Sequence, residues 1–264
     1  MKLEYHHIDA FTDSRFKGNY AGVIITDNWL ADSLMQSVAT ENNLSETAFL
    51  VLESGVYNIR WFSPLTEIDF CGHATLASAF VLFKKNAGLN EITFYAKAVG
   101  QLKVCRAADG YIAMTFPRRA PIKVDEIPSA ITNGLSIEPA EVWQSQQAYF
   151  AIYESEQAVH DVVQNVELIK QLAPHDLVVT AASQSGEYDF ASRYFWPANG
   201  GDEDPVTGSV HAGLVPFWAE RLGENNLVAL QASARGGILK CRVVGEQIEV
   251  AGRAVQYMTG IIEI

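Results

Sequence analysis

The sequence predicts an α+β protein made of two similar β-rich domains. Segments that alternate apolar and polar residues, the pattern of half-buried strands, outnumber the segments with helical periodicity. A strand, an acidic loop and an apolar helix follow one another in the same order in each half of the chain, which indicates a duplication. A segment with three prolines, 117–129, is the best candidate linker. The predicted domains are therefore 1–117 and 118–264, and the C-terminal strand can return to the first.

The predicted strands share an apolar–polar alternation of period two. They are 57–63, 101–107, 111–117, 177–183, 238–244 and 247–253. Helices are predicted at 31–43, 73–85 and 209–223, with a shorter one at 166–172. Two of the helices end on ordinary stop signals, a cation in the last turn followed by glycine. These signals are Lys85 with Gly88 and Arg221 with Gly223.

The duplication is visible in one matched pair of strand endings. "RWFSP" at Arg60–Pro64 corresponds to "RYFWP" at Arg193–Pro197, and each is followed by an acidic loop that leads into a small-residue helix. With one inserted residue in the second loop, Cys71 aligns with Pro205. The same alignment places Gly72 opposite Val206 and His73 opposite Thr207. Each half therefore has one loop–helix junction of the same kind.

Composition and charge exclude several classes of function. The formal net charge is −12, from 31 acidic and 19 basic residues, which repels nucleic acids and anionic membranes. No apolar run reaches the roughly 18 to 20 residues that cross a bilayer. The N-terminal residues lack the apolar core of a signal peptide, so we expect a cytoplasmic protein. An odd count of three cysteines argues against a disulfide framework, and Cys105 and Cys241 are interpreted as buried apolar residues.

Both loop–helix junctions have features of an anion site. A helix N-terminus offers unpaired N–H groups and a partial positive charge, and Gly72 and Gly208 would let a ligand approach the backbone. Thr75, Thr207 and Ser209 are candidate hydroxyl donors to a substrate carboxylate. The alternative for Thr75 and Ser209 is that each simply caps its helix.

Three interpretations apply to the pair Cys71 and His73. A zinc site needs about four ligands. The remaining histidines offer no second closely spaced pair, so no metal is expected; they are His6, His7, His160, His175 and His211. A nucleophilic Cys–His pair needs both side chains on one side of the chain. The third interpretation, a buried cysteine at the start of a helix, is the one we prefer for Cys71.

Several segments resemble those of one protein family. They are "GNYAGV" at 18–23, "NLSETAFL" at 43–50, "WFSPLTEIDFCGHATLA" at 61–77, "EDPVTGSVHAGL" at 203–214 and "QASARGG" at 231–237. Together they are similar to the PhzF-like isomerases of phenazine biosynthesis, from about residue 5 to the end. The resemblance implies a diaminopimelate epimerase-like fold, in which each of two similar domains wraps a barrel-like, mostly antiparallel sheet around a central helix. It places the active site in the cleft between the domains and suggests a homodimer.

The resemblance also assigns roles to residues. Diaminopimelate epimerases and proline racemases use one cysteine at each of the two junctions, whereas here the second position is Pro205, so two-thiol racemisation is not expected. PhzF-like proteins instead use a glutamate that matches Glu46. The family's other active-site positions match His73, Asp204 and Ser209.

The Asn19 turn and Glu46 complete the prediction. Asn19 is a candidate substrate-binding residue, and Tyr20 stands where the family usually has proline. Glu46 precedes an apolar strand-like run, and a carboxyl group at such a strand end can both take and return a proton.

We therefore expect a cofactor-independent isomerase that moves a proton between carbons of a small anionic metabolite. Glu46 is the expected acid–base group, supported by His73 and Asp204. The alternatives are a non-catalytic small-molecule binding protein and an epimerase that uses Cys71 with Glu46.

Overall fold

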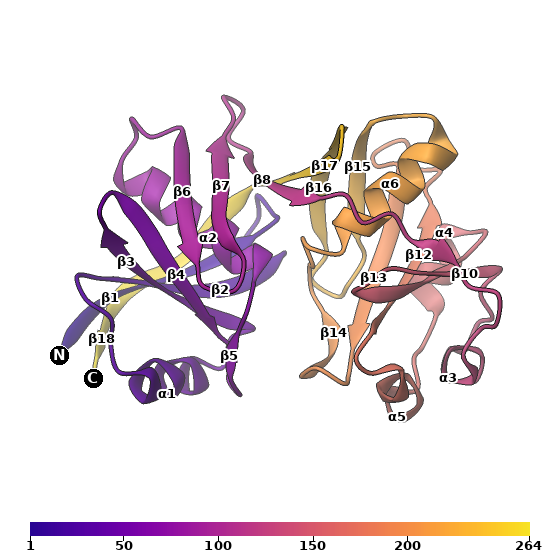
Figure 1. Ribbon diagram of the computed structural model, residues 1–264, viewed down its shortest axis with the longest axis horizontal. Helices are drawn as coiled ribbons and strands as arrows, with labels where there is room; N and C mark the ends of the chain where they lie inside the picture. Colours follow the sequence, from indigo (N-terminus) through magenta and orange to yellow (C-terminus); the bar gives the residue numbers. More distant parts are fainter. The chain divides into compact units, whose positions relative to one another are not determined.

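The chain folds into two β-rich units, and the computed structural model describes residues 1–264. Unit 1 comprises residues 1–115 and 251–264, and unit 2 comprises residues 116–250 (Figure 1). The predicted boundary was two residues later, after 117. The C-terminal residues are part of unit 1 because the last strand, β18, pairs antiparallel with the first strand, β1, along almost its whole length.

The elements of unit 1 are mostly strands, with two helices. In chain order they are β1 (Lys2–Ala10), β2 (Asn19–Thr26), α1 (Asp32–Asn42), β3 (Glu46–Glu53), β4 (Val56–Phe62), β5 (Glu67–Ile68), α2 (Gly72–Lys85), β6 (Glu91–Ala96), β7 (Gly100–Arg106), β8 (Ile112–Pro117) and β18 (Ala254–Glu263). Strand β8 crosses the boundary between the units. The predicted strands and helices of this half are all present, within one or two residues of the expected bounds.

Unit 2 contains strands and several short helices. In chain order they are β9 (Ile122–Lys123), α3 (Ser129–Thr132), β10 (Glu141–Gln144), β11 (Ala148–Ile152), α4 (Glu156–Asp161), α5 (Val166–Ile169), the 3-10 helix η1 (Lys170–Leu172), β12 (Asp176–Ala182), β13 (Phe190–Trp196), β14 (Gly201–Asp204), α6 (His211–Leu222), β15 (Asn226–Gln231), β16 (Gly237–Val244) and β17 (Gln247–Gly252). The proposed linker 117–129 is not a free connection, because β9 lies within it and pairs with β10.

The two units repeat one strand topology, which confirms the duplication. In unit 1, β2 pairs parallel with β3, β3 antiparallel with β4, and β4 antiparallel with β5 and parallel with β6. In unit 2, β11, β12, β13, β14 and β15 pair in the same directions and in the same order. A helix, α2 or α6, occupies the equivalent place in each unit. The fold is therefore of the α+β class, as predicted.

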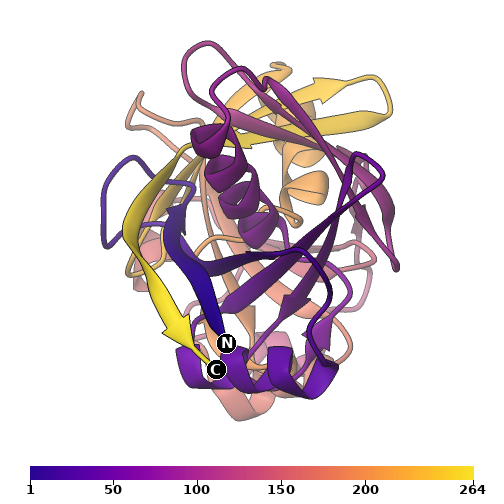
Figure 2. The same cartoon turned by 90° about the vertical axis from the view of Figure 1, so that its left-hand side faces the viewer.

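Helix α2 is the central helix of unit 1. Figure 2 shows it with strands of this unit on either side, and every residue from Gly72 to Ala79 is buried. Helix α6 is similarly buried from His211 to Trp218. A helix that is buried on all its faces belongs inside a domain rather than on its surface, and the small side chains of α2 allow the surrounding strands to approach closely.

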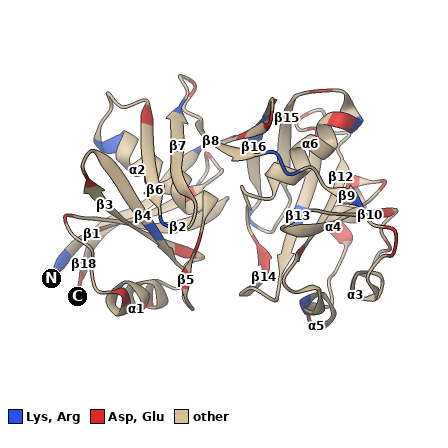
Figure 3. Cartoon of the chain, in the orientation of Figure 1, with Lys and Arg blue, Asp and Glu red and all other residues tan.

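The duplication extends to one ion pair in each unit. Arg60 in β4 forms a two-pronged pair with Glu67 of β5, with both nitrogen–oxygen distances at 2.6 Å. Arg193 in β13 forms the same kind of pair with Glu203 of β14, at 2.9 Å. Figure 3 shows acidic residues on β14 among charges that are spread over both units. The matched arginines of the two sequence repeats thus hold equivalent strand pairs together.

The cysteine predictions are partly correct. Cys241 is buried and free, and burial raises the pKa of its thiol above the usual range. Cys105 is only partly buried, contrary to the prediction. Only Val104 is fully buried in its strand, β7, and the Cys105 thiol donates to Glu91 over 3.9 Å at the surface.

Candidate active site

Glu46 and His73 form a buried polar pair in unit 1. Nε2 of His73 lies 2.9 Å from Oε2 of Glu46, and each side chain is 6% exposed. Glu46 is the first residue of β3 and His73 is the second residue of α2. Burial of a carboxylate is costly unless a donor satisfies it, so this pairing accounts for a glutamate in the core of the unit. The structure thus brings together two of the three residues predicted to be catalytic.

Cys71 adds a thiol to the same cluster. Its Sγ atom donates to Oε2 of Glu46 over 3.5 Å and lies 3.5 Å and 3.8 Å from Nδ1 and Nε2 of His73. Cys71 is the N-cap residue of α2 in extended conformation, and its side chain makes no capping bond. We predicted that Cys71 is a buried cysteine at the start of a helix, and its position and burial confirm this. The contact of the thiol with Glu46 involves the two residues that the epimerase alternative paired.

Asn19 and Ser45 hold the other side of the imidazole ring. Nδ2 of Asn19 lies 3.1 Å from Nδ1 of His73, and the Ser45 hydroxyl donates to Oδ1 of Asn19 over 3.0 Å. Because Oδ1 receives the serine proton, the amide N–H₂ group faces the ring and makes Nδ1 the acceptor. In this arrangement Nε2, the ring nitrogen that faces Glu46, donates to the carboxylate.

Parallel strand pairing explains why these residues meet. Strand β2 begins at Asn19 and β3 at Glu46, and Ala21 is the register partner of Glu46. Neighbouring parallel strands begin at the same edge of a sheet, and α2, which packs on β2, begins at this edge too. Gly18 allows the turn before Asn19: its φ is +65°, and a Cβ there would lie 2.1 Å from the Ala10 carbonyl oxygen. Tyr20 follows as a strand residue, with its ring against His7.

Thr75 makes a hydrogen bond within the first turn of α2. Its Oγ1 donates to the Cys71 carbonyl over 2.6 Å. Thr75 is not the N-cap, since that residue is Cys71, and its role as a donor to a substrate carboxylate stays a prediction. Gly72 is the first residue of the helix and is buried.

In unit 2, Asp204 ends strand β14 and belongs to a well-ordered hydrogen-bonded turn. Oγ1 of Thr207 donates to Oδ2 of Asp204. The buried amide of Gln231 accepts from the Thr207 N–H over 2.7 Å and donates to the Asp204 carbonyl over 2.9 Å. Thr207 therefore uses both of its donors within the turn. Donation from Thr207 to a substrate stays a prediction. Gln231, which opens the "QASARGG" segment, is the residue that fixes the turn.

Ser209 retains a hydroxyl hydrogen that it can donate. The Gln147 amide donates to Oγ of Ser209 over 3.0 Å, which occupies an acceptor position and not the hydroxyl proton. Ser209 is not the N-cap of α6, because that residue is Val210. Gly208, Ser209 and Val210 form a turn, and His211 donates from its backbone N–H to the Gly208 carbonyl over 3.3 Å. The sequence contained no signal for the role of Gln147.

Behind Ser209 lies a buried network that sequence reasoning also missed. The Gln147 amide donates to the Tyr194 hydroxyl over 3.0 Å, and that hydroxyl donates to Oδ2 of Asp176. Asn199 donates to Oδ1 of the same carboxylate over 2.7 Å. Burial raises the pKa of Asp176, although both hydrogen bonds oppose the shift. These contacts hold the Gln147 side chain that positions Ser209.

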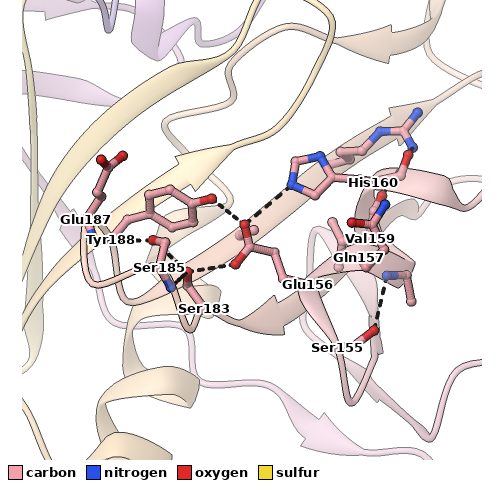
Figure 4. Close-up of polar contacts among 12 residues, drawn as sticks. Ser155, Glu156, Gln157, Val159, His160, Ser183, Ser185, Glu187 and Tyr188 are labelled. Atoms are coloured by element: carbon pink, nitrogen blue, oxygen red, sulfur yellow. Dashed lines mark hydrogen bonds and ion pairs between the residues drawn. The ribbon is translucent and has the colours of Figure 1, made fainter.

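A second polar cluster of unit 2 surrounds Glu156 and has a structural role (Figure 4). The Tyr188 hydroxyl donates to Oε1 of Glu156, and the Ser183 hydroxyl donates to Oε2 over 2.7 Å. Nε2 of His160 lies 3.4 Å from Oε1. Burial by itself would raise the pKa of Glu156, but these hydrogen bonds outweigh it and lower the pKa. The cluster ties α4 to the connection between β12 and β13.

The predicted site residues thus fall into two groups. Unit 1 brings together Asn19, Glu46 and His73. Asp204 and Ser209 both belong to unit 2, where Asp204 bonds to Thr207 and Ser209 bonds to Gln147. The expectation that both groups bind one ligand stays a prediction. None of the helices has the length and hydropathy that a membrane-spanning helix requires.

Comparisons with known proteins identify the family. The model of the phenazine biosynthesis-like protein family matches residues 8–260. The chain belongs to this family. A protein of Pseudomonas aeruginosa that is named an uncharacterized isomerase is 42% identical over 264 residues, which covers all of both chains. The crystal structure of a PhzF family protein of Enterococcus faecalis superposes with a TM-score of 0.95 at 37% identity, with 100% of each chain covered.

The fold is shared more widely than the family. The structure of a hydroxyproline epimerase of Agrobacterium vitis matches with a TM-score of 0.61 at 10% identity, covering 99% of this chain and 92% of the other. The protein is therefore a PhzF-like member of a fold group that includes isomerases and epimerases, as the sequence segments indicated.

Proposed function

We propose that this PhzF-like protein is a cofactor-independent isomerase that moves a proton between two carbons of a small carboxylate-bearing metabolite. The observation that carries the proposal is the buried pair of Glu46 and His73. A carboxylate held by one imidazole donor inside a protein is suited to take a proton from carbon and return it. The names of the relatives support the reaction class.

The mechanism follows from the hydrogen bonds of the pair. His73 donates from Nε2 to Oε2 of Glu46, which fixes the carboxylate, and we assign the substrate proton to the other oxygen, Oε1. Glu46 takes a proton from a carbon that a neighbouring carboxyl group or double bond makes acidic. The same carboxyl group then delivers the proton to another carbon on the same face of the substrate. A single base suffices for both transfers, so the proposal requires no cofactor.

Unit 2 is assigned the binding of polar groups on the substrate. The Ser209 hydroxyl can donate to a carboxylate, and the hydrogen bonds that join Thr207 and Gln231 to Asp204 hold Asp204 in place. Such groups lower the barrier by orientation and by stabilising developing charge.

The distance between Cys71 and Glu46 argues against the two-base epimerase. In that reaction the substrate carbon lies between the two bases. Each base approaches the carbon to about 3–3.5 Å, so the bases must be roughly 6–7 Å apart by the same geometry. The observed separation of Sγ from Oε2 is 3.5 Å. The thiol and the carboxylate therefore contact each other where a substrate carbon would have to fit, and the one-base reaction is favoured.

Solvent deuterium provides the test. A panel of small carboxylates is first screened for ligands by thermal shift, and each ligand is incubated with enzyme in D₂O and followed by ¹H NMR. We expect wild-type protein to introduce deuterium at carbon. Glu46→Gln should bind the same ligand but reduce exchange by at least about a thousandfold, as expected for loss of an acid–base group. Glu53→Gln, an exposed glutamate at the far end of the same strand, is the matched control and should retain full exchange.

Two results would contradict the proposal. Exchange that persists in Glu46→Gln would remove Glu46 from the mechanism. If ligands bind but none of them gains deuterium at carbon, the non-catalytic binding protein is favoured instead.

Ser209→Ala should weaken binding of the same ligand about tenfold, the loss expected for one hydrogen bond to a charged group.

A further inference from the structure

The triad of Glu46, Cys71 and His73 has the composition of a metal site as well as that of an acid–base site. One donor atom from each residue lies within 4.8 Å of the others, and all three residues are buried. Thiolate sulfur, imidazole nitrogen and carboxylate oxygen are the three ligand types that bind zinc in proteins. The sequence revealed only the pair of Cys71 and His73; the parallel pairing of β2 with β3 supplies Glu46 as the third ligand.

The distances between the donor atoms match one face of a zinc tetrahedron. The sulfur–oxygen distance is 3.5 Å, the sulfur–Nε2 distance 3.8 Å and the Nε2–oxygen distance 2.9 Å. Ordinary zinc bond lengths in tetrahedral geometry give corresponding edges of about 3.5, 3.6 and 3.3 Å. The largest change on binding is an increase of a few tenths of an ångström between Glu46 and His73. Three protein ligands leave the fourth position to water or an anion, as in open zinc sites.

Asn19 and Ser45 can support the metal-bound state. A zinc ion on Nε2 requires the His73 proton to move to Nδ1. Rotation of the Asn19 amide turns Oδ1 toward the ring to accept that proton, and Nδ2 then donates to the Ser45 oxygen, which can reverse its role. The outer contacts that hold the imidazole therefore fit both states.

We propose that Glu46, Cys71 and His73 form a Zn²⁺ site that competes with the acid–base role of Glu46. Binding releases the thiol proton of Cys71 to solvent and places Glu46 on the metal, so the carboxylate can no longer take a substrate proton. Metal binding stands on the geometry of the triad alone. The loss of activity that accompanies it rests on the proposed function.

Cobalt provides a spectroscopic probe of the site. The full-length protein, reduced and free of chelators, is titrated with Co²⁺ and then with Zn²⁺. We expect a visible Co²⁺ spectrum with a near-ultraviolet thiolate-to-cobalt band, which Zn²⁺ abolishes by displacement. Cys71→Ser should lose the thiolate band and weaken Zn²⁺ binding by about 100-fold or more, since loss of an outer-shell partner alone costs 10–100-fold. Cys105→Ser removes a partly exposed thiol of the same unit. This variant should keep both the thiolate-to-cobalt band and the wild-type affinity for Zn²⁺.

A measurement on the unmodified protein makes the test independent of whether a variant folds. In ¹⁵N NMR of labelled wild-type protein, Zn²⁺ should move the His73 proton from Nε2 to Nδ1. The proposal would be overturned if wild-type protein showed no thiolate-to-cobalt band, or if Cys105→Ser lost that band. An unchanged His73 tautomer in excess Zn²⁺ would also overturn it. The proposed function and the metal site are tested by different measurements. Persistent deuterium exchange in Glu46→Gln would contradict the proposed function, whereas the cobalt spectrum of wild-type protein tests the metal site alone.

Discussion

His73 donates from Nε2 to Oε2 of Glu46 over 2.9 Å, and both side chains are 6% exposed. The direction of this bond depends on two residues behind the ring. Ser45 donates to Asn19, and Asn19 in turn presents its N–H₂ group to Nδ1 of His73. In this arrangement Ser45, which immediately precedes β3, orients the Asn19 amide, and Nε2 of His73 faces the glutamate as a donor.

The tautomer of His73 is therefore predicted to depend on Asn19. In wild-type protein, long-range ¹H–¹⁵N NMR spectra of the histidine side chains should show His73 neutral with its proton on Nε2. Asn19→Ala removes the donor to Nδ1 and should yield a mixture of tautomers without unfolding the protein. Ser45→Ala should produce a smaller change, because it removes only one of the contacts that orient the Asn19 amide. Ser37→Ala, on the exposed face of α1, is the control, and an unchanged His73 spectrum in Asn19→Ala would refute the relay.

The regular elements were accessible from the sequence because each has its own periodicity. Strands β4, β7, β12 and β16 follow the predicted bounds closely, and α1, α2 and α6 are within two residues of theirs. Helices α3 and α4 were missed because they have four and six residues, too few to show a helical period. The only local signal for α4 is Ser155, whose side chain accepts from the Ala158 N–H as an N-cap.

The site was predictable only in part. Glu46 and His73 were predicted as site residues from segments that resemble a family. The contact between them was not predicted. That contact depends on which strands pair in parallel and on which helix packs against them. No single sequence segment predicts the strand pairing or the helix packing. Gln147 and Gln231 were missed for the same reason, since each acts through residues at least 24 positions away. The hydrogen bonds that Thr75 and Thr207 make to nearby residues were also not predicted, because a hydroxyl near a helix start looks the same in the sequence whether it donates to a ligand or to a neighbouring residue.

The duplicated arginines are predicted to differ in their contribution to stability. Arg193 is 17% exposed, and besides Glu203 it donates to three carbonyls around the end of α4, those of Val159, His160 and Val162. Arg193→Met leaves a half-buried carboxylate without its partner and should cost about 3 kcal/mol. Arg60 pairs with carboxylates that are 43% and 78% exposed, so Arg60→Met should cost about 1 kcal/mol.

Urea unfolding of the two variants side by side measures this difference, and each serves as the other's matched control. The larger loss for Arg193→Met should persist at 0.5 M salt, roughly where screening between exposed charges has become strong. Equal losses in the two variants would show that the carbonyl contacts around α4 add nothing to the ion pair.

The last prediction concerns His211, the first residue of α6. Burial lowers the pKa of His211 from its ordinary 6.5 to about 4, and the hydrogen bond from Nδ1 to the Thr207 carbonyl, at 2.9 Å, opposes the shift only in part. The folded protein therefore keeps His211 neutral down to about pH 4, whereas the unfolded chain binds a proton near pH 6.5. Below pH 6.5 the unfolded state holds more protons, so the stability that neutral His211 provides is complete above this pH and is lost progressively as the pH falls toward 4.

The expected loss from this residue over that range is about 3 kcal/mol, from 1.36 kcal/mol for each pH unit of the difference. His211→Asn keeps a side-chain donor near the Thr207 carbonyl but cannot titrate. Its free energy of unfolding should therefore fall less steeply than that of wild type between pH 7 and 4.5, which urea titrations at several pH values would show. Parallel pH profiles for wild type and His211→Asn would mean that His211 is not kept neutral in the folded protein.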